Sequence, residues 1–511
     1  MTEQLSRHAT WLALITFIVI EAFLFNAHFL PTVSAETDGI GYMSRASGDL
    51  FRIHPFHGPG YSLFIRALGV IGLDAFNAAK LISILSGALL ILASARVFDA
   101  LTDRRTAVIA TFLVALNPVV ITRSIAAMSD MMAASLCVFA LAIFLNEKAR
   151  STLWLCALAG SAAGLAHITR SIYIALILLP VLAFVLCQPR IRFSSVVVYL
   201  IGFLIVASPW MIFLYNETGS PLWSHSHLNV AFKMAAGSDG WNGFPTIEDY
   251  ASWGDVIAPD PILFIKTWLR TLVTLPWTLL KTWPVIGALG FIGLFVWLRE
   301  IRGNKLLLLA FLSLYAGLVS LVWPEERFLI VFMPFIALLV ASAVDVVPDV
   351  SPKLIGFNGL ERWVPLPTAS LRTLCIVVLI GSLLLTSRDR VQEFFKGHAP
   401  EYQAAIDWLD GQVDSGDSIL SAKPHFAFFT ETTNINFRDV WLQQKDAKQF
   451  DAILAETNPT FVVFDEVYAA VHFPKLDYLL DAKPTRTLVP VKVIKTPRKL
   501  VIYAYRNPVQ R

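Results

Sequence analysis

The chain has 511 residues, of which 56% are hydrophobic and only 15% are charged, whereas an ordinary soluble domain carries about 25% charged residues. A composition this apolar predicts a polytopic membrane protein. The formal net charge is +3, and the basic residues lie in short, scattered clusters. Because they form no continuous basic face, nucleic acid is not an expected partner. The four cysteines lie within or at the edge of apolar runs, so no disulfide framework is predicted.

Apolar segments of membrane-spanning length recur along most of the chain. The first follows Arg7 and resembles a signal peptide at its start, but it is long enough to cross about 30 Å of hydrocarbon and lacks a clean cleavage site. We expect it to be an uncleaved span. Together the segments predict a mainly α-helical bundle of about eleven spans: 10–30, 78–98, 106–122, 128–145, 152–168, 171–187, 195–215, 283–298, 304–323, 327–346 and 371–387.

The positions of lysine and arginine predict the orientation of the bundle. These residues collect in the connections 103–105, 146–150, 189–192 and 299–305, which the positive-inside bias assigns to the cytoplasm. The N-terminus is then cytoplasmic, and the protein is expected in the cell inner (plasma) membrane. Residues 1–387 form the expected transmembrane domain, whose main outer loops are 31–77 and 216–282.

The composition changes from about residue 388. AAIDWLDGQV predicts an amphipathic helix, DSGD a turn, and SILSA, FVVFD and LVIYAY short strands. Residues 388–511 are therefore expected to form a small α/β domain on the extracytoplasmic side. The preceding connection 347–370, with its prolines, is expected to be a linker.

The first outer loop begins with a candidate helix over residues 37–49. Its polar residues recur at helical spacing on one face: Asp38, Tyr42, Arg45 and Asp49. Ile40 and Met43 lie largely elsewhere and are expected to face the lipid boundary. The Asp38 carboxylate could serve in proton transfer at the mouth of the bundle, or it could simply cap the helix.

A rigid turn rich in glycine and proline follows this helix, with the sequence HPFHGPGY from His54 to Tyr61. Here the chain resembles the polyprenyl-phosphate-sugar-dependent glycosyltransferases of the GT-C fold, including the protein O-mannosyltransferase-like and lipid A aminoarabinose transferase-like enzymes. The aspartate and tyrosine that these enzymes carry soon after the first span correspond to Asp38 and Tyr42. Gly39 replaces the second acid of their usual acidic pair, which puts a two-carboxylate metal site in doubt.

The resemblance continues through short segments that cover most of the chain. ALNPVVITRSIAAMSDMM is similar to a family turn that ends in an acid, here Asp130. HITRSIYIAL around Arg170 and WPEERFLIVFMPFIAL around Arg327 also resemble family segments. An outer α/β domain at the C-terminus is likewise known among family members.

A lipid-linked sugar donor needs cations at the outer ends of the spans, and guanidinium groups match the geometry of phosphate. Arg170 and Arg327 are the first candidates, and the alternatives for them are snorkelling or pairing with a nearby acid: Asp130, Glu325 or Glu326. The full set of expected substrate-binding residues is Tyr42, Arg45, His54, His57, Arg123, Asp130, Arg170, Glu326 and Arg327. Lys80 is expected to be a surface anchor.

The resemblance implies an inverting transfer in which Asp38 is the general base and polyprenyl phosphate leaves. The expected product is a hexosylated or pentosylated glycan, lipid or protein acceptor. The sequence does not specify a cofactor. A divalent metal ion is the candidate, and the two loop histidines are weak candidates for its ligands. A transporter or flippase of a lipid-linked intermediate is the alternative, because Glu21 lies in the middle of the first span. Glu21 could also make a structural hydrogen bond.

Overall fold

A computed structural model of the chain describes residues 2–27, 36–54, 56–187, 191–235, 245, 247–282, 284–299, 301–322, 325–354, 368–396, 400–437 and 447–506. The chain divides into two compact units. The first contains residues 1–27, 45–236 and 245–394, and the second contains residues 28–44, 237–244 and 395–511. The division falls inside one helix, α3 (Glu36–Ser47).

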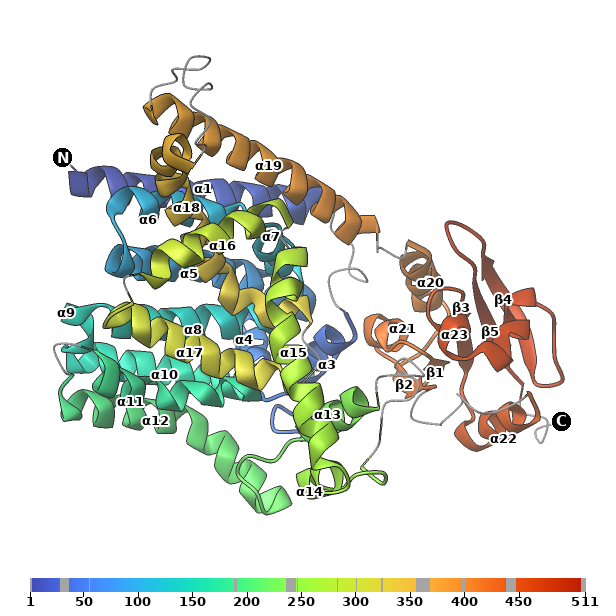
Figure 1. The fold of residues 1–511 in the computed structure, drawn as a ribbon. Helices are drawn as coiled ribbons and strands as arrows, with labels where there is room; N and C mark the ends of the chain where they lie inside the picture. Colours follow the sequence, from blue (N-terminus) through green and yellow to red (C-terminus); the bar gives the residue numbers. More distant parts are fainter. Residues whose placement is uncertain are drawn as a thin grey trace. The chain divides into compact units, whose positions relative to one another are not determined.

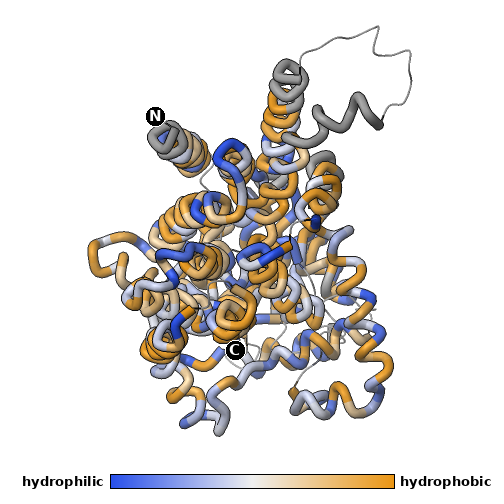
Figure 2. The backbone as a smooth tube through the Cα atoms, turned by 60° about the vertical axis from the view of Figure 1, so that its left-hand side comes forward, coloured by the Kyte–Doolittle hydropathy of each residue, from blue (hydrophilic) through white to orange (hydrophobic). Residues whose placement is uncertain are grey.

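Helices make up the first unit (Figure 1), and hydrophobic residues prevail along them (Figure 2). In chain order they are α1 (Thr2–Ala27), α4 (Gly60–Gly69), α5 (Ala75–Leu101), α6 (Arg104–Ala115), α7 (Pro118–Ile125), α8 (Asp130–Leu145), α9 (Glu147–Arg150), α10 (Leu153–Thr169), η1 (Ser171–Leu178), α11 (Leu179–Leu186), α12 (Phe193–Thr218), α13 (Ser226–Met234), α14 (Trp253–Ile257), α15 (Pro261–Thr282), α16 (Pro284–Leu298), α17 (Asn304–Val319), η3 (Glu326–Phe332), α18 (Met333–Leu354) and α19 (Thr368–Lys396).

Within the described ranges, four helical segments are long and apolar enough to cross a membrane: His8–Phe25, Ala75–Leu101, Phe193–Thr218 and Glu326–Val344. The bent pair α6 and α7 adds a fifth, with an angle of 46° between its halves. Several shorter apolar helices accompany them. The mainly helical membrane fold is therefore confirmed, whereas the predicted number of about eleven spans is not.

The bend between α6 and α7 has a local cause. Asn117 caps α7, since its side-chain oxygen accepts hydrogen bonds from the backbone N–H groups of Val119 and Val120. Pro118 occupies the first helical position, where its missing N–H costs nothing. The sequence LNP thus ends one helix and begins another inside an apolar run.

Small residues bring α10 and α12 into close contact. A Cβ atom on Gly160 would lie 2.0 Å from the backbone oxygen of Tyr199, and one on Gly164 would lie 2.6 Å from that of Phe203. Gly202 of α12 approaches α10 in the same way. Glycines four residues apart, as in GSAAG, let helix backbones approach closely in apolar surroundings.

Two charged side chains are buried near the α1–α5 contact. Lys80 is only 1% exposed, and its ammonium lies 3.5 Å from the ring centroid of Phe25. The expectation that Lys80 is a surface anchor is therefore wrong, because it lies against a neighbouring helix and not at the solvent boundary. Glu21 is 0% exposed, and neither of its carboxyl oxygens has a hydrogen-bond partner among the described residues.

The second unit contains the predicted α/β domain, which is confirmed. Its sheet has the order β2-β1-β3-β5-β4, formed by β1 (Ser418–Ser421), β2 (Thr433–Asn436), β3 (Phe461–Asp465), β4 (Leu488–Ile494) and β5 (Leu500–Tyr505). Strand β1 pairs in parallel with β2 and β3, while β5 pairs antiparallel with β3 and β4.

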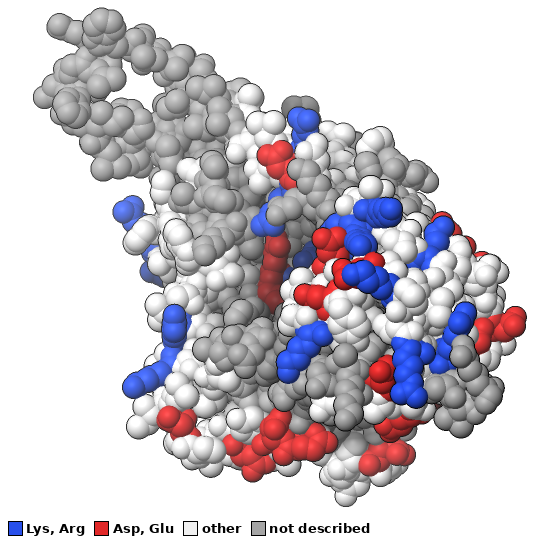
Figure 3. All heavy atoms as spheres, turned by 90° about the vertical axis from the view of Figure 1, so that its right-hand side faces the viewer, with Lys and Arg blue, Asp and Glu red and all other residues white. Residues whose placement is uncertain are grey.

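Helices cover both faces of this sheet (Figure 1). Alternate residues of β3 enter two cores: Phe461 and Val463 pack with α20 (Pro400–Asp410) and α21 (His425–Phe429), whereas Val462 and Phe464 pack with α22 (Ala447–Thr457), α23 (Ala469–His472) and η6 (Pro474–Asp481). This alternation is the period of a strand buried on both sides. On the surface drawn in Figure 3, basic and acidic side chains are interspersed among the described residues.

Candidate functional site

Helix α3 carries the candidate base. It spans Glu36–Ser47, close to the predicted range, and Asp38 on it is partly buried. Asp49 lies beyond its end. Ile40 is 3% exposed and Met43 is 0% exposed. The expectation that these two face lipid is wrong, because both are enclosed by protein.

Arg45, near the end of α3, holds the loop that follows. Its guanidinium donates hydrogen bonds to three backbone carbonyls: those of Arg52 at 3.0 Å, His57 at 3.0 Å and Gly58 at 2.7 Å. The side chain is 6% exposed. These contacts commit much of its donor capacity to the loop. Arg45 therefore fixes the loop that carries both candidate histidines.

The same loop packs onto the end of α10. A Cβ atom on Gly58 would lie 2.0 Å from the backbone oxygen of Ile168, and one on Gly60 would lie 2.4 Å from Oγ1 of Thr169. Arg170 directly follows these two α10 residues. Glycine is required at positions 58 and 60 because the loop backbone touches the helix end, which brings the loop beside Arg170.

His54 and His57 stack on each other, with ring centroids 4.3 Å apart and planes inclined by 8°. Nδ1 of His54 accepts a hydrogen bond from the Phe56 backbone N–H. Because the two rings are parallel, the lone pairs of their nitrogens lie in parallel planes and do not converge on one point where a metal ion could bind. In the part of the chain that the structure describes, no three His, Cys, Asp or Glu side chains are grouped to hold a metal ion.

Arg170 forms a buried ion pair with Asp130, with 2.8 Å between Nη2 and Oδ2. Its Nε also donates to Oγ of Ser129 at 3.1 Å. Arg170 is 8% exposed and Asp130 is 3% exposed. Oδ1 of Asp130 has no hydrogen-bond partner among the described residues. This ion pair lies at the start of α8, beside the end of α10, and its two charges neutralise each other.

Two tyrosines that the sequence analysis did not single out lie beside this pair. The Tyr315 hydroxyl donates to the backbone oxygen of Phe328 at 3.0 Å and lies 3.3 Å from the Tyr173 hydroxyl. The Phe328 ring in turn lies 5.2 Å from the guanidinium of Arg170. Tyr173 follows Arg170 by three residues in SIY, and that spacing is the signal that could have identified it.

The turn near residue 327 contains a second set of ion pairs. Nε of Arg327 lies 2.6 Å from Oε2 of Glu325, and Nη2 of Arg390 lies 3.6 Å from Oε1 of Glu326. The guanidinium of Arg327 stacks on the same Phe328 ring at 5.2 Å. Both candidate phosphate ligands, Arg170 and Arg327, thus pair with acids. This outcome is the alternative that the sequence left open.

Two further candidates are Arg123 and Tyr42. Arg123 is in the last turn of α7 and is partly exposed. Tyr42 is 1% exposed on α3. A binding role for either residue stays a prediction.

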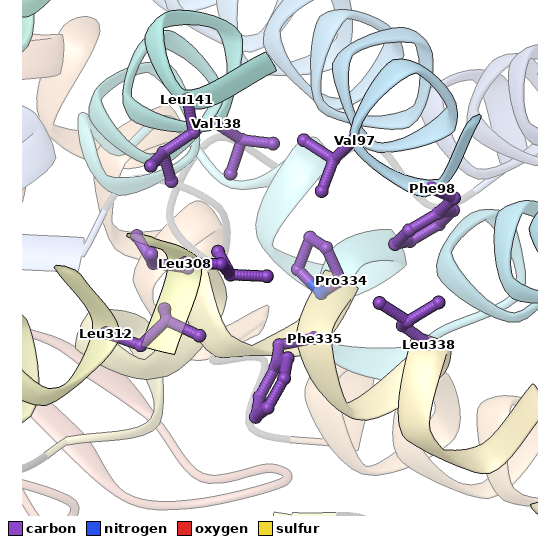
Figure 4. A pocket seen from close by; sticks show the side chains of 10 residues that line it. Val97, Phe98, Val138, Leu141, Leu308, Leu312, Pro334, Phe335 and Leu338 are labelled. Atoms are coloured by element: carbon purple, nitrogen blue, oxygen red, sulfur yellow. The ribbon is translucent and has the colours of Figure 1, made fainter. Parts of the chain in front are cut away.

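An apolar cavity lies elsewhere in the helical unit, among α5, α8, α17, η3 and α18 (Figure 4). Its lining consists of Val97, Phe98, Val138, Leu141, Leu308, Leu312, Val331, Pro334, Phe335 and Leu338. None of these side chains can transfer a proton or bind a charge. The cavity therefore supplies no group for proton transfer or for binding a phosphate.

Residues 54–213 match the family described as dolichyl-phosphate-mannose-protein mannosyltransferase. That segment contains the histidine loop, Asp130 and Arg170. No curated protein matches the sequence.

Solved structures match over almost the whole chain. ArnT from Cupriavidus metallidurans, bound to undecaprenyl phosphate, is 14% identical with a TM-score of 0.56, and the match covers 96% of this chain and 97% of that one. The oligosaccharyltransferase AglB from Archaeoglobus fulgidus is 15% identical with a TM-score of 0.56, covering 89% of this chain and 69% of that one. This chain has the GT-C fold. The resemblance inferred from the short motifs is confirmed at the level of that fold.

Within the GT-C fold of this chain, residues from different parts of the sequence meet in the region around Arg170. The loop held by Arg45 rests on the end of α10 at Arg170, and Arg170 pairs with Asp130 at the start of α8. Arg327 approaches the same region through the Phe328 ring that it shares with Arg170. Most of the predicted residues of the helical unit therefore belong to one group of contacts around Arg170.

Proposed function

We propose that this chain is an integral membrane glycosyltransferase that moves a sugar from a polyprenyl-phosphate donor to an acceptor hydroxyl on the outer face of the membrane. The observation that carries the proposal is the GT-C fold over nearly the full chain, together with an aspartate on α3, which follows the first span. Two of the solved neighbours hold undecaprenyl phosphate and dolichol-phosphate, which supports a lipid-phosphate donor.

In the proposed reaction, Asp38 accepts the proton of the acceptor hydroxyl. The acceptor oxygen attacks the anomeric carbon from the face opposite the leaving group, so the configuration inverts. The bond between that carbon and the phosphate oxygen breaks, and polyprenyl phosphate leaves with the electron pair. The sugar is a hexose or a pentose, and the acceptor is a glycan, a lipid or a protein.

The leaving phosphate needs positive charge more than it needs a strong acid. Arg170 and Arg327 are the proposed sources of this charge. Each is paired with a carboxylate, so a bound phosphate would have to share the guanidinium with Asp130 or Glu325. The two arginines flank one aromatic ring, which supports a joint role for them.

The test replaces the base. Asp38→Asn keeps the shape of the side chain and removes its basicity, so transfer should fall by about 10² to 10⁴. Membranes containing each variant are incubated with a panel of radiolabelled polyprenyl-phosphate sugars, and the labelled acceptor fraction is counted. Asp49→Asn is the matched control because Asp49 is exposed and lies beyond the end of α3. Wild-type transfer by the Asp38→Asn protein would refute the mechanism.

A transporter or flippase of a lipid-linked intermediate is the second candidate, and Glu21 favours it. A fully buried carboxyl group without a hydrogen-bond partner among the described residues is costly within a span, and transporters use such groups to relay protons. A flippase should lose activity in Glu21→Gln and tolerate Asp38→Asn. A glycosyltransferase should instead lose activity in Asp38→Asn and tolerate Glu21→Gln.

A further inference from the structure

The first turns of α3 belong to the same compact unit as the C-terminal α/β domain. That unit joins residues 28–44 to residues 395–511. Within it, Nζ of Lys423 donates a hydrogen bond to Oγ1 of Thr37 at 3.0 Å. Thr37 directly precedes Asp38. A side chain of the C-terminal domain therefore touches the helical turn that carries the proposed base.

Lys423 occupies a particular place in the sheet. Strand β1 ends at Ser421 and its parallel neighbour β3 ends at Asp465, so both carboxyl ends meet at one edge. The chain leaves β1 toward β2 on one side and leaves β3 toward β4 and β5 on the other. Such a switch point, outside the carboxyl ends of strands, is where open α/β sheets place their functional residues. Lys423 lies in the loop that leaves β1.

Several groups at this edge hold the Lys423 side chain. Its ammonium lies 3.9 Å from the ring centroid of Tyr468, which follows β3. Burial raises the pKa of Asp465, and this rise is partly offset by backbone N–H groups, by the Tyr402 hydroxyl and by the charge of Lys423. Asp465 also accepts a hydrogen bond from the Tyr468 backbone N–H at 2.6 Å. The contact with the Tyr468 ring thus restricts a side chain that is otherwise flexible, and the charge of Asp465 attracts its ammonium.

We propose that Lys423 is a positioning residue that holds the first turn of α3, and through it Asp38, in the orientation needed for proton transfer. The inference rests on the proposed function, since it assumes that Asp38 is the base. A cation near the start of a helix is unfavourable to the helix dipole, so the contact is not explained by stabilisation of α3. It is explained by the hydrogen bond that fixes the turn next to Asp38. Small misplacements of a reacting group are costly in rate.

The kinetic test uses the full-length protein and the radiolabelled polyprenyl-phosphate sugar that supports wild-type transfer. Lys423→Met and Thr37→Val should each lower kcat about tenfold or more and leave KM for the donor within about twofold. Because both variants break one contact, the double variant should be no slower than the worse single one. Lys423→Arg keeps a donor and should recover part of the rate. Lys483→Met is the control, since Lys483 is an exposed lysine of the same domain.

A second measurement reads the contact without catalysis. Hydrogen–deuterium exchange of the α3 amides should be faster in Lys423→Met than in Lys483→Met. A Lys423→Met protein with wild-type kcat overturns the positioning role, and so does a fall in kcat without faster exchange. Independent losses that multiply in the double variant also overturn it. Wild-type transfer by Asp38→Asn instead overturns the base assignment, so the two failures are distinguishable.

Discussion

The helical unit and the α/β domain both bury charged side chains, but they stabilise them differently. In the helical unit, Asp130 is matched by one arginine at 2.8 Å, and one of its oxygens has no hydrogen-bond partner among the described residues. In the α/β domain, Oδ1 of Asp465 accepts a hydrogen bond from the Tyr468 backbone N–H at 2.6 Å, and Oδ2 likewise has no hydrogen-bond partner among the described residues. The two carboxylates therefore differ in the kind of partner: the loop after a strand supplies a backbone donor to Asp465, whereas a neighbouring helix end supplies an opposite charge to Asp130.

The two regions also pack differently. In the helical unit, Gly160 and Gly164 of α10 bring backbones into contact with α12. In the α/β domain, the sheet uses large alternating residues on both of its faces. The helices of the bundle therefore pack closely because glycine places no side chain between the backbones, whereas the sheet of the domain packs through large side chains. The predictions below probe these contrasts.

The largest expected effect comes from breaking the buried ion pair. Arg170→Ala leaves Asp130 charged, buried and unpaired, which should lower the free energy of unfolding by about 3 to 5 kcal/mol. The midpoint of thermal unfolding in detergent reports the change. The double variant Arg170→Ala/Asp130→Ala should recover a large part of the loss, because no lone charge remains. A double variant less stable than Arg170→Ala would contradict the ion-pair explanation.

Packing between α10 and α12 should be the next most sensitive feature. Gly160→Ala adds a Cβ atom that would lie 2.0 Å from the Tyr199 backbone oxygen, so the helices must separate at a cost of about 1 to 3 kcal/mol. Gly381→Ala is the control, because a Cβ atom there has nothing within 4 Å. The control should be neutral or slightly stabilising through helix propensity. Equal unfolding midpoints for the two variants would remove the argument for close packing.

The α/β domain should lose stability in acid because of His425. Burial lowers the pKa of His425 to about 3, with the charge of Lys423 as a smaller cause. The unfolded chain therefore binds a proton at higher pH than the folded one, and stability is lost as pH falls from about 6.5 toward 3. The slope from this group is at most about 1.4 kcal/mol per pH unit.

The measurement compares wild type with His425→Phe at a series of pH values, using the thermal unfolding of the full-length protein. Asp465 has a raised pKa and contributes with the opposite sign, but it is present in both proteins, so the difference isolates His425. The variant should have the flatter profile. Parallel profiles would show that His425 is not buried in its neutral form.

The smallest effect is expected at an exposed ion pair of the α/β domain. Lys483 and Asp481 lie 3.1 Å apart, with side chains 77% and 57% exposed. Lys483→Met should change the free energy of unfolding by less than about 0.5 kcal/mol, because solvent screens the pair. A loss as large as that of Arg170→Ala, measured by the same unfolding midpoint, would contradict the contrast between buried and exposed charges.

Much of the secondary structure could be read from the sequence. The short apolar runs FVVFD and LVIYAY predicted β3 and β5, and the long apolar runs predicted helices such as α5 and α12. Helix α15 was missed within the expected outer loop 216–282, since Lys266, Arg270 and Pro276 interrupt its apolar run. Breaks at Asn117 and Pro118 also shortened an expected span, because local capping was stronger than the apolar pattern.

The candidate site was only partly predictable. Asp38, Asp130 and Arg170 could be named because their residue types and neighbouring motifs resemble a family. The pairing of Arg170 with Asp130 and of Arg327 with Glu325 was among the alternatives that the sequence left open. The hydrogen bonds of Arg45 to loop carbonyls and the contact of Lys80 with an aromatic ring could not be predicted, because no local pattern specifies such contacts. Tyr315 joins the Arg170 region from a helix distant in sequence.

The sequence by itself determined that this chain is helical and membrane-embedded, with an α/β domain at its end, because apolar periodicity and strand alternation are local properties. Only the tertiary structure decided which charges are paired, which glycines touch a neighbouring backbone, and that Lys423 contacts the turn before Asp38. These contacts join residues that are far apart in the sequence, 40 positions for Asp130 and Arg170 and 386 positions for Thr37 and Lys423, and that only the fold brings together. Burial then raises the cost of leaving any of them unmatched.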